Sequence, residues 1–215
     1  MQQDFLTLND CDNVCLSGGA DGADLQWGMT AGTRGDAVIH FIFRGHRSKA
    51  PEAEKVVLTR AQLLEADPFL EKANKTLKRR FPGSNDFVNS LLRRNYYQVA
   101  WSQACYAISE IDKNQLVKGG TAWAVQMFLD LHPEGKCYVF DQKKEQWFQW
   151  KNGWCPIISP PAPEGVWAGI GTRELNDAGK KAIRDLMGWQ KPLRGANADI
   201  VHVDDMVFYD TPPWE

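Results

Sequence analysis

Three glycine-rich turns are the part of this sequence that is best equipped for chemistry. Each opens a helix-like segment, and each supplies a hydroxyl or a cation beside its glycines. The turns are Ser17-Gly18-Gly19-Ala20, Lys118-Gly119-Gly120-Thr121 and Gly169-Ile170-Gly171-Thr172-Arg173. Glycine lets the backbone approach a ligand closely, and the N–H groups and dipole of a helix start favour an anion. Together the turns predict a site for a phosphate-bearing ligand.

Carboxylates and further cations accompany these turns. Asp21 and Asp24 follow the first turn, where they either accept ribose hydroxyls or stabilise the start of the helix. A group of cations either pairs with phosphate oxygens or lies on solvated loops and helix faces. This group consists of Arg44, His46, Arg47, Arg93 and Arg94.

Alternating strand-like and helix-like segments must position these residues. Apolar runs rich in β-branched and aromatic residues predict parallel strands at residues 12–17, 37–43, 105–111, 136–141 and 166–171. Helical spacing predicts helices at 20–33, at 50–80 with an interruption at Asp67-Pro68, after an Asn85 or Asp86 cap, at 118–132 and at 175–186. The fold class is therefore α/β, with a mostly parallel sheet flanked by helices. In such a sheet all three turns lie at the carboxyl edge and face one crevice.

Within the helix that follows residue 85, the apolar spacing predicts a buried face. Its members are Val88, Leu91, Leu92, Tyr96 and Val99. Residues 145–150, EQWFQW, predict a small antiparallel, tryptophan-rich addition, and the prolines that follow mark a surface connector at about 151–164. With a helical insertion at about 50–101, the 215 residues form a single domain.

Composition narrows the possible functions. A net charge of −2 and a pI near 6.1 argue against a general nucleic-acid binder, so the basic run from Lys72 to Arg80 is interpreted as a solvated helix face. The five cysteines contain no C-x-x-C pair, and without a signal peptide they indicate reduced thiols and a cytoplasmic location. The four histidines show no metal-binding spacing, and no apolar run is long enough to span a membrane.

The turns also carry a family resemblance. "LSGGADGAD", "KGGTAWAV" and "AGIGTR" resemble the SGGA-x-GAD, G-G-T and G-S-R turns of the SLOG superfamily. That group of Rossmann-like proteins includes the DNA-processing A proteins, the Lonely Guy nucleotide phosphoribohydrolases and several ligand-sensing domains. The resemblance covers about two thirds of the chain and implies a Rossmann-like fold with a nucleotide-type ligand.

Two departures from the family pattern matter. Most members carry the G-S-R turn on the first strand, whereas here the matching turn comes last, so the chain resembles a circular permutation in which the first and last strands are neighbours. The Lonely Guy motif P-G-G-x-G-T-x-x-E, aligned on Gly119-Gly120, places Gln126 at the catalytic glutamate and Trp123 at a small residue. Glutamine cannot exchange a proton as a carboxylate does, so the chain is expected to have lost hydrolysis and to keep no catalytic residue there.

The leading hypothesis is binding, for sensing or sequestration, of a nucleotide or nucleotide-derived signalling metabolite such as an ADP-ribose-like or cyclic nucleotide. The resemblance implies a place in prokaryote–phage conflict. One alternative is a nucleotide N-glycosidase of Lonely Guy type that uses Asp24 or Glu110, and another is single-stranded nucleic-acid binding. The expected partner is a small molecule, with no cofactor, metal or membrane, and self-association stays open.

Overall fold

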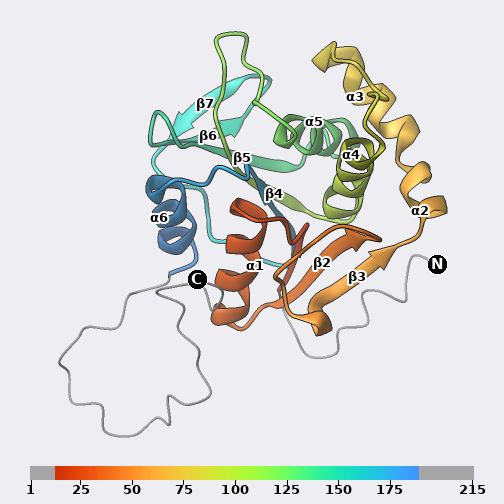
Figure 1. Cartoon of the computed structure of the whole chain (residues 1–215). Helices are drawn as coiled ribbons and strands as arrows, with labels where there is room; N and C mark the ends of the chain where they lie inside the picture. The colour runs from red at the N-terminus through yellow and green to blue at the C-terminus, as the bar shows by residue number, and fades with distance from the viewer. Residues whose placement is uncertain (1–12, 189–215) are drawn as a thin grey trace, which may run out of the picture.

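The computed structural model describes residues 13–188 and contains an eight-stranded sheet in the order β3-β2-β1-β8-β4-β5-β6-β7 (Figure 1). The strands are β1 Val14–Ser17, β2 Ala37–Phe43, β3 Lys55–Leu58, β4 Ala104–Ser109, β5 Lys136–Asp141, β6 Gln146–Trp150, β7 Trp154–Ile157 and β8 Val166–Gly171. The helices are α1 Ala23–Arg34, η1 Glu52–Glu54, α2 Arg60–Glu65, α3 Asp67–Leu77, α4 Asp86–Val99, α5 Thr121–Leu131 and α6 Asp177–Leu186. The predicted α/β class is confirmed.

The sheet is parallel from β3 to β5, and β6 and β7 continue it as antiparallel strands. Strand β8 lies between β1 and β4, with Val14 opposite Val166 and Ala104 opposite Trp167. The prediction that the first and last strands are neighbours is therefore confirmed. Because β1, β8 and β4 are parallel, their carboxyl ends meet at one edge of the sheet.

Helices cover both faces of the sheet, as the alternation along β4 shows. Cys105 and Ala107 pack in one apolar cluster with α3, α4 and α5, whereas Tyr106 and Ile108 pack in another with α1 and α6. Successive residues of a strand point to opposite faces, so these two clusters lie on opposite sides of the sheet. Figure 1 shows α1 and α6 on one side and α4 and α5 on the other.

The segment predicted as helix over 50–80 contains a strand instead at its start. After the short 3-10 helix η1, residues 55–58 form β3, which pairs in parallel with β2, and the α-helices begin only at Arg60. The Val56 and Val57 pair favours extended backbone, and pairing with β2 satisfies the backbone groups that a helix would otherwise have satisfied. The predicted break near Asp67-Pro68 is present, because α2 ends and α3 begins around Ala66.

The predicted buried face of α4 is wrong in part. Asn85 caps the helix as expected, with its side chain accepting from the Val88 N–H, but the Val88 side chain is 46% exposed. The buried positions include six polar residues, Asn89, Ser90, Arg93, Arg94, Asn95 and Gln98. A helix that buries polar side chains in place of an available valine is typical of a functional site.

Two further expectations can be compared with the structure. Cys15, Cys105 and Cys137 are buried free thiols and Cys155 is an exposed one, while Cys11 lies outside the described residues. Between residues 13 and 188, no helix is long and apolar enough to cross a membrane.

Candidate functional site

The first and third predicted turns are in direct contact, because β1 and β8 are neighbours. The Ala23 N–H donates to the Thr172 carbonyl at 2.9 Å, and the Gly171 N–H donates to Asp24 Oδ1 at 2.9 Å. The Ser17 hydroxyl is buried and lies 2.8 Å from the carbonyl oxygens of both Asp24 and Gly169. The sequence separation of about 150 residues is thus closed by hydrogen bonds between side chains and backbone at the carboxyl edge.

Gly22 makes this close approach possible. It caps α1 with a φ of +97°, and a Cβ there would lie 2.4 Å from the Arg173 carbonyl oxygen. The backbone conformation and the contact both exclude a side chain. No side chain of the described residues caps α1, and the first N–H groups donate to backbone carbonyls instead, that of Ala23 to Thr172 and that of Leu25 to Ala20.

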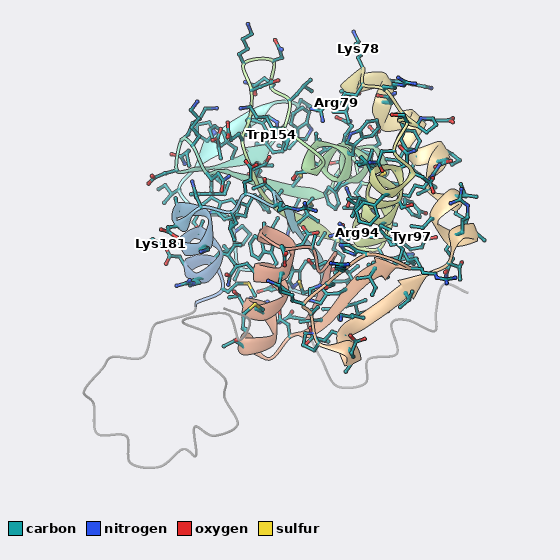
Figure 2. All side chains as sticks on the ribbon, in the orientation of Figure 1. Lys78, Arg79, Arg94, Tyr97, Trp154 and Lys181 are labelled. Atoms are coloured by element: carbon teal, nitrogen blue, oxygen red, sulfur yellow. The ribbon has the colours of Figure 1, made fainter. Side chains whose placement is uncertain are left out.

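A buried ion pair joins the first turn to helix α4. Arg94 Nη1 donates to Asp24 Oδ2 at 2.9 Å, and the two side chains are 5% and 7% exposed (Figure 2). Burial raises the pKa of the Asp24 carboxyl, while the Arg94 guanidinium and the Gly171 N–H oppose that rise. The guanidinium lies over Gly18, where an added Cβ would fall 0.9 Å from Nη1.

Polar atoms near this ion pair lack partners. Arg94 Nε and both amide atoms of Gln98 are buried without a hydrogen bond of normal geometry in the described part of the chain, although the Gln98 amide is close enough to Asp24 to lower the pKa of that carboxyl. Gln98 lies one helical turn after Arg94 on the same side of α4 and is fully buried. Buried polar groups are almost always hydrogen-bonded, so this side of α4 has unused capacity for hydrogen bonds.

The loop between β2 and β3 packs against the first turn. The Ser48 hydroxyl donates to the Gly19 carbonyl at 2.6 Å, and Lys49 Nζ lies 3.9 Å from Asp21 Oδ1. His46 stacks on Phe43 with ring centroids 5.2 Å apart. Burial and the Arg94 charge lower the pKa of His46 to about 4, so this ring is neutral at pH 7.

His40 packs beneath the first turn, next to Gly19. Its ring is 1% exposed, and an added Cβ at Gly28 would lie 2.4 Å from ring atoms. Neither ring nitrogen has a hydrogen bond to residues 13–188, although Nε2 lies 3.5 Å from Glu54 Oε2. Burial and the Arg94 charge lower the pKa of His40 to about 4, so it too is neutral at pH 7.

The second predicted turn lies at the end of β4 but is held differently. The Ser109 hydroxyl donates to the Lys118 carbonyl at 3.3 Å, and Asn95 of α4 approaches the Gly120 carbonyl at 3.5 Å. Arg79 donates to the Gly119 carbonyl at 2.7 Å, which gives one residue of the basic run a structural role (Figure 2). A Cβ added at Gly120 would meet no atom of the described residues within 4 Å, so steric packing there does not require a glycine.

The predicted site residues therefore divide by burial. The members that the structure buries or holds by hydrogen bonds at the edge are Ser17, Gly18, Gly19, Asp24, Thr121, Gly169 and Gly171. The exposed or half-buried members around them are Ala20, Asp21, Arg44, Lys118, Gly119, Gly120, Thr172 and Arg173. Lys118 is already paired with Glu110 at 2.6 Å.

Three residues at this edge were not considered from the sequence, namely His40, Ser48 and Gln98. Arg94 was left between a phosphate partner and a solvated helix face, and the structure shows that it is buried. For Arg94 and Gln98 a signal existed, because polar residues four apart on an otherwise amphipathic helix share one side. For His40 and Ser48 no local pattern indicated that they would pack beneath the first turn.

Fold and site together define an α/β protein whose polar groups converge on the carboxyl edge of β1, β8 and β4. No protein-family model, no curated protein and no solved structure matches this chain. The arrangement of its own residues must therefore support any functional proposal.

Proposed function

We propose that this protein binds a phosphate-bearing, nucleotide-derived small molecule at the carboxyl edge of β1, β8 and β4. The observation that carries the proposal is the meeting of the first and third turns at the start of α1, beside the buried Arg94, whose Nε has no hydrogen bond within the described residues. A guanidinium is a donor that phosphate oxygens favour, and glycine turns let a phosphate approach the backbone closely. Sensing or sequestration of a signalling nucleotide, such as an ADP-ribose-like or cyclic nucleotide, is the corresponding role.

The order of the strands supports a permuted Rossmann-like arrangement. If β8 is counted as the first strand and β1, β2, β4 and β5 follow, the spatial order β2-β1-β8-β4-β5 becomes 3-2-1-4-5. That is the order of the doubly wound nucleotide-binding sheets, in which the ligand lies where the order reverses. Here the reversal falls between β8 and β4, next to Gly171 and Ser109. This order is the expected result of a circularly permuted SLOG-like chain.

The states of the candidate acids favour binding over hydrolysis. Both carboxylate oxygens of Asp24 are engaged, by Arg94 and by the Gly171 N–H, and Glu110 is paired with Lys118. The Gln126 amide donates to Asp130 Oδ1 at 2.9 Å, within α5. A general base needs an atom free to take a proton from the substrate, whereas both Asp24 oxygens already accept hydrogen bonds and the Gln126 amide cannot take a proton as a carboxylate does.

The first experiment identifies the ligand. The compound released by heat from the purified protein is analysed by mass spectrometry and then incubated with fresh protein, alongside AMP and its N6-substituted analogues. Unchanged recovery supports binding. Enzyme-dependent release of free base contradicts it and favours the N-glycosidase alternative.

The second experiment tests the position of the site with Arg173, an exposed cation at the end of the third turn. Arg173→Ala should weaken binding of the recovered phosphorylated compound by ~1.5–3 kcal/mol, the scale of a hydrogen bond to a charged group. Lys136→Ala is the matched control, because Lys136 is an exposed cation at the start of β5 and hence at the opposite edge. Equal affinities of the Arg173→Ala variant and the wild type in calorimetry would refute this assignment.

A further inference from the structure

A second concave region lies away from the carboxyl-edge turns, between helix α6 and the antiparallel strands β6 and β7. Figure 1 shows α6 beside β6 and β7, at the end of the sheet opposite β3. The hollow between them has a volume of about 820 Å³. Its sheet side is formed by Phe140, Trp147 and Ile157, and its helix side by Ala178, Ala182 and Leu186.

An apolar projection stands at the rim of this hollow. Ile158 follows β7 directly, borders the hollow and has a side chain that is 99% exposed. Covering this isoleucine with a partner would be favourable, because it removes apolar area from water. One surface thus carries both a hollow with apolar residues on its sheet and helix sides and an apolar residue of a size that can enter it.

The charges around the hollow have both signs. Lys181 Nζ lies 2.5 Å from Asp185 Oδ2 on α6, and both side chains are exposed. Glu145 lies on the opposite side of the rim. Figure 2 shows Lys181 on the outer side of α6, away from Arg94 and Tyr97. A rim of mixed sign disfavours a strongly charged partner and is self-complementary with a rotated copy of itself.

The outer edge of β7 is unsuited to pairing with another strand. Pro156 lies within β7 and lacks an N–H, and Pro160 and Pro161 follow shortly after. Prolines at an edge strand block edge-to-edge pairing. A partner on this surface must therefore be held by side chains in the hollow rather than by extension of the sheet.

We propose that this surface is the interface of a two-fold homodimer, in which Ile158 of each copy enters the hollow of the other. A two-fold interface requires that each surface contain both members of every contact. The adjacent hollow and Ile158 satisfy this requirement, and the same rotation brings Lys181 of one copy toward acidic rim residues of the second copy. The proposal is independent of the ligand site at the carboxyl edge.

Sedimentation velocity of the full chain over a concentration series tests the interface. The wild type should show a concentration-dependent dimer. Ile158→Asp should raise the dissociation constant of the dimer by more than about tenfold, because burying an aspartate between apolar side chains is unfavourable. Ile158 is fully exposed, so the monomer should keep the wild-type circular dichroism spectrum. Val57→Asp is the matched control, since Val57 is 60% exposed on β3 at the other end of the sheet.

A charge exchange tests the orientation of the two copies. Lys181→Glu should weaken the dimer, and adding Glu145→Lys on the other side of the hollow should restore part of the lost affinity. A wild-type chain that remains monomeric across the series overturns the proposal, and protection of β6 and β7 from hydrogen exchange in that monomer would assign the hollow to another segment of the same chain. Equal weakening by Ile158→Asp and Val57→Asp also overturns it.

Discussion

At the scale of single residues, the ion pair between Asp24 and Arg94 joins the elements of the carboxyl edge. One Asp24 oxygen holds the third turn through the Gly171 N–H, and the other holds α4 through Arg94. Gly18 has no side chain, which leaves room for the guanidinium. Asp24 thus fixes the relative positions of β1, β8 and α4. The predicted contact of its carboxylate with the ribose of a ligand stays a prediction.

Replacing Arg94 should show how much the burial of an unpaired Asp24 charge destabilises the folded protein. Arg94→Met leaves the Asp24 charge buried without its partner, and such variants lose about 3–5 kcal/mol of stability. Burial raises the pKa of Asp24 and Arg94 opposes that rise, so without Arg94 the folded-state pKa lies further above its unfolded value. The folded variant then binds the proton more tightly than the unfolded chain, so its penalty is largest near neutral pH and shrinks as the pH falls.

Urea unfolding at about pH 5 and about pH 7.5 measures this difference. Arg93→Met is the matched control, because its neighbouring partner Asp67 has a side chain that is 31% exposed and remains solvated. The control should lose less stability than Arg94→Met and depend less on pH. A penalty for Arg94→Met that is constant with pH would contradict the role assigned to Asp24.

At the scale of elements, α4 departs most from an ordinary amphipathic helix. It leaves Val88 largely exposed while burying Arg94 and Gln98 toward the carboxyl edge. Burying an amide without hydrogen bonds costs free energy, so this side of the helix is not optimised for stability. Stability is commonly sacrificed in this way where a surface must remain able to bind.

Replacing the unpartnered amide should therefore stabilise the protein. Gln98→Met keeps a similar volume and removes two buried polar atoms, and it should raise the free energy of unfolding by about 1 kcal/mol. Gln98→Ala separates polarity from volume, because it removes the same atoms but leaves a cavity and should not stabilise. Thermal and urea unfolding compare the three chains, and a destabilised Gln98→Met would indicate that the amide has a hydrogen-bond partner in solution.

At the scale of the whole molecule, the position of β8 between β1 and β4 is the feature that unites the sheet. Residues at the two ends of the described chain pair as neighbouring parallel strands, and the Val14 N–H donates to the Gly165 carbonyl at 2.8 Å. The order of the chain can then change without changing which strands are neighbours.

A permuted chain tests this property. Its natural ends are joined by a flexible linker, and the chain is opened between Ser159 and Pro160, in the connector after β7. This variant should fold with the wild-type circular dichroism spectrum and keep its ligand affinity, because every strand pair is retained. Opening the chain between Ala107 and Ile108, within the buried strand β4, is the control that should prevent folding. Failure of the first variant under conditions where the wild type folds would contradict the permuted arrangement.

Local pattern determined much of the fold. The apolar runs at 37–43 and 136–141 coincide with β2 and β5, and the Asn85 cap is present, because these features depend on neighbours in the sequence. The adjacency of β1 and β8 was also predicted, although from the family resemblance rather than from periodicity. Strand β3 was missed, since a four-residue strand between helical segments gives too short a period to recognise.

Tertiary structure alone decided the state of the candidate site. Which oxygens of Asp24 are engaged, that Arg94 occupies the space over Gly18, and that His40 lies beneath Gly19 all depend on contacts between elements far apart in sequence. Sequence supplies residue types and local periodicity, which identify the turns. Whether a charge is buried, paired or left available depends on packing across the sheet edge, because long-range contacts fix both the dielectric surroundings and the partners of each group.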